Sequence, residues 1–310
     1  MYIFIIVKLV TDPLTDFEGS DLTDALDGLS YLCVTARTIG INAHKYLEYS
    51  HAVYVVKLLG TLKENIREQG RMRFKPLILF LLLSFVFINN SIAAKQCVIL
   101  LHALARTTHS MSPIATCLEK ANYIVVSQNY LTTKKSIKDL ANEDVPSMVS
   151  QCQQYKPSKI HFVTHSLGGI VLREYLQGVH LPNLGRVVML APPNHGSQLA
   201  DLLHRNLLFK LITGPAGQEL TTSQSSTPNT LNQSVTYQLG IIAGNFSFNP
   251  FSKAIFHEDN DGKVSVSSAR IKGMKDFIIV PVSHMFMTNS KLVQQEIVFF
   301  LQNGEFRRTT

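Results

Sequence analysis

Short apolar runs alternate with stretches of helical periodicity from residue 95 to the end of the chain. Short runs rich in Val, Ile and Leu are typical of buried strands, whereas apolar residues spaced three and four apart indicate helices. The predicted strands are 97–101, 123–126, 159–164, 186–190, 237–243 and 277–280. The predicted helices are 111–121, 136–154, 167–177 and 290–301. Strands separated by helices predict a mostly parallel central sheet with helices on both faces.

Residues 196–233 interrupt this alternation. The second half of the segment is rich in Ser, Thr and Gln, and the segment contains no predicted strand. Loops of this length in compact domains are usually functional or disordered. We therefore expect an insertion that forms a cap or lid on the sheet domain, which we assign to residues 95–310.

The composition is that of a globular protein with a sizeable core. The chain has 310 residues, of which 45% are hydrophobic and 16% are charged, and this size allows one large domain or two small ones. A net charge of +7 could favour nucleic acid or an anionic membrane surface as a partner. Because Lys and Arg form no long run, we expect no nucleic-acid partner, and a membrane surface stays open. The sequence does not indicate an oligomeric state.

Residues 72–94 have the three parts of a secretory signal peptide. Basic residues occupy positions 71, 73 and 75, an apolar run covers 76–88, and Ser91-Ile92-Ala93 provides small residues before an expected cleavage point. The apolar run of thirteen residues is short for a membrane span, which needs about 20. This segment is therefore a candidate export signal.

The internal position of this segment leaves its exact role open. Signal peptides begin proteins, so we predict that translation starts at Met72 and that residues 1–71 are an upstream extension without assignable chemistry. If Met1 is the true start, the segment would act as a signal anchor, with its basic cluster in the cytoplasm. Both readings place residues 95–310 in the periplasm or outside the cell. The alternative is a buried hydrophobic helix that packs on the domain.

Four cysteines, Cys33, Cys97, Cys117 and Cys152, show no metal-ligand spacing, so we predict no structural zinc site. If the domain is exported, Cys117 and Cys152 are a candidate disulfide pair. They lie on different predicted helices. The alternative is that these thiols are buried and free.

Residues 159–176 predict a strand, a sharp turn at Ser166 and a helix. In such a nucleophile elbow the serine adopts a strained backbone conformation, so the residues two before and two after it must be small. Gly168 meets this requirement. Thr164 stands where the G-x-S-x-G pattern has glycine, and its branched side chain is a departure from that pattern. Ser166 is the candidate nucleophile.

A serine hydroxyl is a poor nucleophile at pH 7 unless a base takes its proton and an acid orients that base. In chains built around such an elbow, the order is nucleophile, acid, base. Of the 11 histidines, only His284 follows the acidic cluster 258–262, which makes it the candidate base. We prefer Asp261 as the acid because Asp261-Gly262 predicts a tight turn at a strand end. Asp259 is the alternative.

Four motifs in sequence order resemble those of α/β-hydrolase lipases and esterases, and together they cover about residues 96–306. The family motifs are an H-G-L-x-R turn, an H-S-x-G-G elbow, an A-P-P-N-x-G-S strand end and a D-G-x-V acid loop. In this chain they stand as His102-Ala-Leu-Ala-Arg106, His165-Ser-Leu-Gly-Gly169, Ala191-Pro-Pro-Asn-His-Gly-Ser197 and Asp261-Gly-Lys-Val264. The resemblance implies the α/β-hydrolase fold and a triad of Ser166, Asp261 and His284.

The oxyanion of acyl transfer needs hydrogen-bond donors, usually two backbone N–H groups. One candidate is Leu167, at the start of a helix, and the resemblance implies Leu104 as the other. Ala103 replaces the family's glycine in that turn, and if its φ is positive the alanine costs on the order of 1 kcal/mol. His102 and His165 flank the site, and we expect them to order loops rather than transfer protons.

The implied function is that of a secreted carboxylic-ester hydrolase of esterase or lipase type. It would act on a small-molecule or lipid ester and would need no metal or organic cofactor. The same machinery supports amide hydrolysis or acyl transfer to an acceptor other than water. A non-catalytic, membrane-associated binding module on a hydrolase scaffold is a second hypothesis, although decayed catalysts usually lose a triad member and this chain keeps all three.

Export predicts a specific N-terminus. We expect N-terminal sequencing of the mature protein to find a chain that begins just after Ala93, because signal cleavage removes the apolar run. A signal anchor would instead leave that run on a protein found in the membrane fraction. Intact Met1 on a soluble cytoplasmic product would contradict both export readings.

Overall fold

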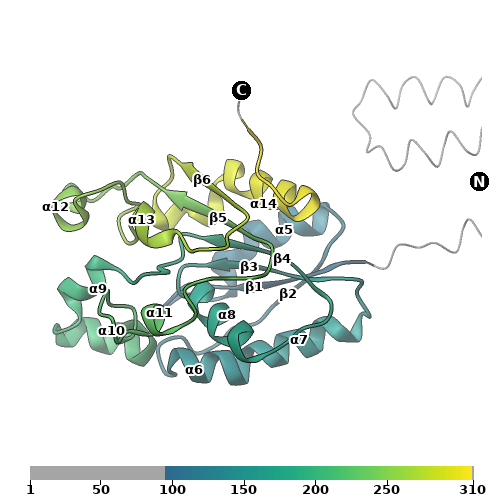
Figure 1. The fold of residues 1–310 in the computed structure, drawn as a ribbon, viewed down its shortest axis with the longest axis horizontal. Coiled ribbons are helices and arrows are strands. Elements are labelled where there is room, and N and C mark those ends of the chain that lie inside the picture. The colour runs from purple at the N-terminus through teal and green to yellow at the C-terminus, as the bar shows by residue number, and fades with distance from the viewer. Residues whose placement is uncertain (1–94, 309–310) are drawn as a thin grey trace, which may run out of the picture. The chain divides into compact units, whose positions relative to one another are not determined.

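The computed structural model describes residues 95–308. The predictions made for the extension 1–71, for the segment 72–94 and for a start at Met72 lie outside these described residues. The insertion, all candidate site residues and all but the last two residues of the predicted sheet domain lie within them. Figure 1 shows the described part of the chain in colour.

Six parallel strands form the central sheet, in the order β2-β1-β3-β4-β5-β6. All six predicted strands are confirmed, and their ends differ from the prediction by at most two residues. The strands are β1 (Cys97–Leu101), β2 (Ile124–Ser127), β3 (Ile160–His165), β4 (Leu184–Leu190), β5 (Leu239–Gly244) and β6 (Asp276–Val280).

Helices follow the strands in the connections between them, and the four predicted helices are confirmed. The α-helices are α5 (Ser112–Lys120), α6 (Ile137–Asp139), α7 (Val145–Gln154), α8 (Leu167–Gly178), α9 (Gln198–Leu203), α10 (Leu207–Gln218), α11 (Thr227–Thr230), α12 (Ser252–Phe256), α13 (Val266–Ala269) and α14 (Lys291–Asn303). The 3-10 helices are η1 (Thr108–Met111) and η3 (His284–Asn289), and η2 (Leu140–Asp144) is a π-helix.

Two hydrophobic cores lie on opposite faces of the sheet because side chains alternate along each strand. On β1, Cys97, Ile99 and Leu101 pack in the core that also holds α6, α7 and α8. Val98 and Leu100 pack in the core that holds α5 and α14. Figure 1 shows these two helical layers on either side of the strands. The sheet is thus buried on both faces, as the unbroken apolar strands predict.

The predicted helix 136–154 contains a wide turn at its centre. In η2 the N–H of Val145 donates to the carbonyl oxygen of Leu140, five residues earlier. Pro146 follows directly, and a proline has no N–H and crowds the carbonyl four residues before it. The wider π-turn accommodates the proline without ending the helix.

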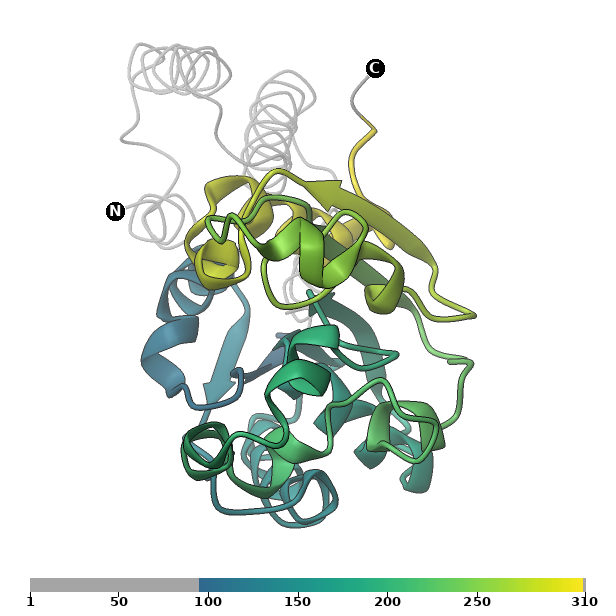
Figure 2. The same ribbon diagram turned by 90° about the vertical axis from the view of Figure 1, so that its left-hand side faces the viewer.

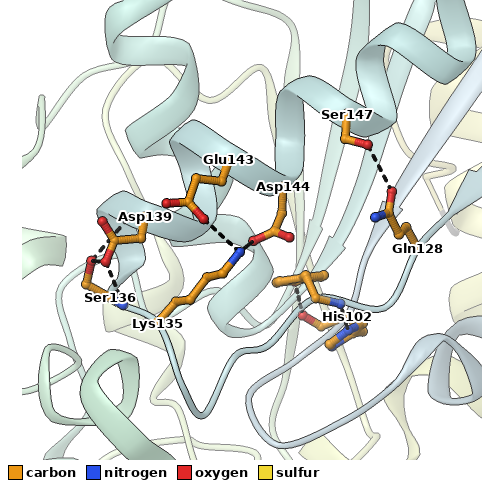
Figure 3. Close-up of polar contacts among 9 residues, drawn as sticks. His102, Gln128, Lys135, Ser136, Asp139, Glu143, Asp144 and Ser147 are labelled. Carbon is orange, nitrogen blue, oxygen red and sulfur yellow. Dashed lines mark hydrogen bonds and ion pairs between the residues drawn. The ribbon is translucent and has the colours of Figure 1, made fainter.

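Polar contacts tie down the start of this helix, as Figure 3 shows. Ser136 caps the helix, because its Oγ accepts the N–H of Asp139 at 3.1 Å and also contacts the Asp139 carboxylate. The Nζ of Lys135 lies 2.9 Å from Glu143 and 2.8 Å from Asp144. Ion pairs near the protein surface typically contribute about 1 kcal/mol or less. In these two pairs Lys135 and Asp144 are half-buried and Glu143 is exposed.

The insertion and two further connections lie at the edge of the sheet formed by the carboxyl ends of the strands. Helices α9, α10 and α11 follow β4, helices α12 and α13 follow β5, and η3 follows β6. Because all strands are parallel, these segments leave from the same edge, and Figure 2 looks onto it. Among residues 95–308, no helix has both the length and the apolar character that a membrane span requires.

The disulfide differs from the predicted one. Cys97 on β1 is joined to Cys152 on α7, and their Cα atoms are 5.9 Å apart. Among residues 95–308, Cys117 on α5 has no disulfide partner, and its Sγ lies 3.9 Å from the carbonyl oxygen of Gln294. The predicted bond between Cys117 and Cys152 is wrong, because α5 and α7 cover opposite faces of the sheet. The Cys97 side chain instead points to the face that α7 covers.

Loss of this disulfide should lower the free energy of unfolding by about 2–4 kcal/mol, because it closes a long loop in the unfolded chain. We expect Cys152→Ser to unfold at a lower urea concentration than the unchanged protein. The matched control is Cys117→Ser, which removes the free thiol and should unfold with little change. Equal losses in the two variants would contradict the observed pairing.

Candidate active site

Ser166 lies in a sharp turn between β3 and α8, where the order of the strands reverses. The chain passes from β1 to β2 on one side and then returns to β3 on the other side of β1. In open parallel sheets, ligands bind at the carboxyl ends of the strands at such a switch point. Ser166 has φ 53° and ψ −118°, which is strained for a residue with a side chain. Its N–H donates to the carbonyl oxygen of Leu190 at 2.9 Å.

Two glycines allow α8 to start beside the sheet. A Cβ atom on Gly168 would lie 2.6 Å from the carbonyl oxygen of Leu101, so only glycine fits there. A Cβ atom on Gly169 would lie 3.3 Å from the Oγ1 of Thr164 and 3.0 Å from the Cβ of Pro192. The space left by Gly169 therefore accommodates Thr164, which stands where the elbow pattern has glycine.

Asp261 and His284 are in contact at the same edge of the sheet. Their Oδ2 and Nδ1 atoms are 2.7 Å apart, and both side chains are buried. The Oδ1 of Asp261 accepts the N–H groups of Lys263 at 3.0 Å and Val264 at 2.8 Å. Because a carboxylate can only accept, Nδ1 of the imidazole carries a proton and donates. The Nε2 atom is then the ring nitrogen that Asp261 does not hold.

The two candidate acids differ in burial. Asp259 is exposed, and its carbonyl oxygen accepts the N–H of Val266 within the same loop. Asp261 is buried and is followed by Gly262, whose φ of 93° forms the tight turn expected from the sequence. Asp261 also accepts the backbone N–H of His284 on its own carbonyl oxygen, at 2.9 Å. Of the two carboxylates, Asp261 is the one that contacts His284.

His165, the last residue of β3, packs against His284. The centroids of the two rings are 4.8 Å apart. Because His165 directly precedes Ser166, this contact brings the loop of His284 to the sharp turn. In the part of the chain that the structure describes, neither buried ring nitrogen of His165 has a hydrogen bond of good geometry. Burial and the neighbouring His284 hold the pKa of His165 well below its usual range, so the ring is neutral. His165 therefore orders the loop of His284 through ring packing.

The turn after β1 contains the expected oxyanion segment. The carbonyl oxygen of Ala103 accepts the N–H of Arg106 at 3.2 Å, and the N–H of Ala105 donates to the Oγ1 of Thr132 at 3.0 Å. The residue of this turn with a positive φ is Ala105, at 51°. The strain considered for Ala103 therefore falls on Ala105, the third residue of the turn that the bond from Arg106 to Ala103 closes.

His102 holds this turn against the loop after β2. Its Nδ1 lies 3.0 Å from the carbonyl oxygen of Ala103, its Nε2 lies 3.4 Å from the backbone nitrogen of Tyr130, and the two rings stack at 4.1 Å. One nitrogen therefore donates and the other accepts, as a neutral imidazole requires. Burial lowers the pKa of His102, which favours that neutral form. His102, labelled in Figure 3, orders a loop as expected.

Two backbone N–H groups are available near the turn at Ser166. Leu167 is the first residue of α8, so its N–H has no partner inside the helix. In the described part of the chain, the N–H of Leu104 donates no hydrogen bond. The end of β1 lies against Gly168, which brings the turn that holds Leu104 towards the start of α8. Free N–H groups at a helix start favour an anion.

Arg173, which the sequence motifs do not single out, binds backbone groups near the two ends of the insertion, which we call its base. It lies on α8 and is buried, and in the described residues it pairs with no carboxylate. Its guanidinium donates to the carbonyl oxygens of Asn194 at 2.9 Å, Pro228 at 3.2 Å and Asn232 at 3.0 Å. Burial lowers the pKa of Arg173 to about 10, so it stays charged at pH 7. The sequence feature that could have indicated this role is a single arginine among the apolar residues of the helix after Ser166.

The segment after β4 joins the insertion to the acid loop. The Oγ of Ser197 donates to the carbonyl oxygen of Lys263 at 2.6 Å. The side-chain amide of Asn194 donates to the carbonyl oxygen of Ala269 at 2.8 Å. These bonds fix the loop of Asp261 relative to the base of the insertion. Among residues 95–308, no three His, Cys, Asp or Glu side chains gather as a metal site would require.

Several solved structures of lipases share this arrangement of strands and helices. The mature lipase BlEst2 of Bacillus licheniformis is 22% identical, with a TM-score of 0.58 over 67% of this chain and 93% of its own. The chain has the α/β-hydrolase fold. The phospholipase PlaB of Legionella pneumophila is 17% identical, with a TM-score of 0.56 over 68% of this chain and 61% of its own. Aspergillus fumigatus lipase B is 15% identical, with a TM-score of 0.51 over 67% of this chain and 53% of its own.

No protein-family model matches the chain, and no curated protein matches it in sequence. At these identities the similarity to the lipases is one of fold. The α/β-hydrolase fold accounts for the places of the motifs, because its nucleophile, acid and base follow different strands in that order. Here Ser166, Asp261 and His284 follow β3, β5 and β6.

Because the backbone at Ser166 is strained, a glycine there should give a more stable protein than an alanine, the reverse of the usual order. Both Ser166→Ala and Ser166→Gly remove the hydroxyl, but only glycine adopts this backbone conformation without strain. We expect the glycine variant to have a free energy of unfolding about 1 kcal/mol higher than the alanine variant. Urea unfolding of the two variants measures this difference. A more stable alanine variant would show that the turn is relaxed.

Proposed function

We propose that the protein is a serine hydrolase that cleaves carboxylic esters through Ser166, His284 and Asp261. The observation that carries this proposal is the 2.7 Å contact between Asp261 Oδ2 and His284 Nδ1, at the edge where Ser166 occupies its strained turn. The fold supports the reaction class, because it is shared with the lipase BlEst2 and the phospholipase PlaB.

In the proposed mechanism, the Nε2 of His284 takes the hydroxyl proton of Ser166 as its oxygen attacks the ester carbonyl. Asp261 orients the imidazole and stabilises its positive charge. The N–H groups of Leu104 and Leu167 hold the negative oxygen of the tetrahedral intermediate. His284 then gives the proton to the departing alcohol, which leaves an acyl-enzyme.

A water molecule completes the reaction. His284 takes a proton from the water as its oxygen attacks the acyl-enzyme, and the second tetrahedral intermediate uses the same two N–H groups. Collapse of this intermediate returns the proton to Ser166 and releases the carboxylic acid. An alcohol or amine acceptor in place of water would make the same steps an acyl transfer.

We further propose that the hydrolase domain is exported and acts outside the cytoplasm. Disulfides persist in oxidising compartments and are rare in the cytosol. The Cys97–Cys152 bond supports this placement. It adds an observation from the folded domain to the signal-like pattern of residues 72–94.

The proposed triad predicts that two nearby carboxylates behave differently. Asp261→Asn should lower kcat for p-nitrophenyl esters by about 10,000-fold, because an amide cannot keep the imidazole in its productive form. Asp259→Asn is the matched control, since Asp259 is exposed, and it should leave kcat nearly unchanged. Initial rates at saturating ester measure both effects. A large loss in the Asp259 variant with none in the Asp261 variant would reverse the assignment.

A fluorophosphonate probe serves as the control for the nucleophile. The unchanged protein should be labelled, and Ser166→Ala should not. Labelling that survives Ser166→Ala, or an unchanged protein that resists labelling, would refute the serine-hydrolase mechanism. A labelled protein that cleaves no p-nitrophenyl ester of any chain length would indicate acyl transfer or amide hydrolysis in place of ester hydrolysis.

A further inference from the structure

An exposed apolar surface borders the candidate active site. It is formed by three segments, 202–212, 246–256 and 285–292, which follow β4, β5 and β6 at the edge that Figure 2 shows. Each segment carries large apolar side chains that are exposed to solvent. Soluble proteins rarely expose many such side chains together, and a binding surface is the usual reason when they do. We call this surface the apolar rim.

The first part of the apolar rim lies on α9 and on the first half of α10. Leu207 and Leu211 are each 72% exposed. The helix breaks at Gly214, which has φ 62°, and beyond the break Ala216 is fully buried. The second half of α10 therefore anchors the insertion, while the first half presents its apolar side chains outward. The other exposed members of this part are Leu202, Leu208 and Ile212.

The second part of the apolar rim is aromatic and reaches the loop of His284. The rings of Phe246 and Phe248 are 4.8 Å apart, and those of Phe248 and Phe286 are 5.7 Å apart. Phe286 comes two residues after His284 in η3. Phe251, which directly precedes α12, is 71% exposed. The aromatic cluster thus extends from the loop after β5 to the loop of the proposed base.

Contact between α9 and α12 joins the two parts. Leu202 of α9 and Ala254 and Ile255 of α12 line a surface pocket between the two helices. Figure 2 shows the insertion, in green, below the lighter green segment that contains α12. The apolar rim is therefore one surface and not two separate patches.

The charges of the apolar rim are predominantly positive. Its exposed cations are Arg205, Lys210, Lys253 and Lys291, and its three segments contain no Asp or Glu. One carboxylate, Asp201, lines the pocket that joins the two parts, where it accepts hydrogen bonds from the N–H and hydroxyl groups of Thr222. Cations around exposed Leu and Phe side chains favour a surface that offers both acyl chains and negative head groups. A second copy docked rim to rim would instead place cations against cations. The charge pattern therefore favours an anionic lipid surface.

We propose that the apolar rim docks on the surface of an anionic lipid bilayer. Leu208, Leu211 and Phe248 enter the boundary between head groups and acyl chains, and the flanking Lys and Arg side chains contact lipid phosphates. The substrate class that follows is an ester held in that bilayer, and this part rests on the proposed ester hydrolysis. Docking itself requires no catalysis, so an experiment can contradict the docking without contradicting the proposed ester hydrolysis, and the reverse.

Vesicle sedimentation tests docking with the full chain carrying Ser166→Ala, which cannot consume lipid. We expect it to bind vesicles of phosphatidylcholine with added phosphatidylglycerol, to bind pure phosphatidylcholine less tightly, and to lose binding as salt rises. Adding Leu208→Asn, Leu211→Asn and Phe248→Asn together should weaken binding at least about tenfold. Retained binding in this rim variant would overturn the proposal.

The matched control substitutes exposed apolar residues at the opposite edge of the sheet. Tyr155→Asn and Val179→Asn change the ends of α7 and α8, which precede the starts of β3 and β4, and both side chains are exposed. This control variant should bind the anionic vesicles as the parent does. An equal loss of binding in the control would overturn the role of the apolar rim. So would a lipid-free dimer that the rim substitutions convert to a monomer, because a second copy would then be the occupant.

Two esters separate docking from chemistry in the protein with Ser166 intact. The rim variant should hydrolyse a water-soluble, short-chain p-nitrophenyl ester as the unchanged protein does. Its hydrolysis of an ester held in anionic vesicles should fall at least about tenfold. Equal loss on both esters would overturn a docking role in favour of a folding defect. An unchanged protein that binds vesicles but cleaves neither ester would contradict the proposed function while supporting the docking.

Discussion

The close approach of α8 to β1 is the constraint on which the candidate active site depends. At Gly168 the helix lies so near the carbonyl oxygen of Leu101 that no side chain fits between them. The chain can reach that position from β3 only through a sharp turn, and Ser166 takes the strained backbone conformation that results. Such strain costs about 1–3 kcal/mol and persists because buried strands on both sides hold the turn. The same turn starts α8 at Leu167, so the N–H of Leu167 lies next to Ser166 and has no partner inside the helix.

The other parts of the site reach this turn on separate loops, and buried polar contacts hold them there. Arg173 binds the backbone carbonyls of Asn194, Pro228 and Asn232 at the two ends of the insertion. Ser197 links that base to the acid loop through the carbonyl oxygen of Lys263. In a low dielectric each bond is strong when made and costly when lost. The geometry of Asp261 and His284 therefore depends on residues that take no part in the proposed chemistry.

Local patterns in the sequence determined most of the scaffold. Six apolar runs and four periodic stretches predicted the strands and helices, because hydrophobic periodicity is a property of neighbouring residues. The elbow around Ser166 and the order of the later acidic cluster and His284 nominated the candidate site in the same way. The sequence does not show how Thr164 can replace the glycine of the elbow pattern, because the space beside Gly169 depends on the packing of α8 against the sheet.

Tertiary structure decided what depends on faces and burial. Asp261 and Asp259 are two positions apart and chemically identical, and only the fold buries one against His284. Cys152 pairs with β1 because it lies on the matching face of the sheet, which spacing along the chain does not show. The sequence places the apolar start of α10 in the insertion but does not show whether its side chains are buried. The break at Gly214 turns it to solvent, because periodicity defines a helix face and only packing decides what that face meets.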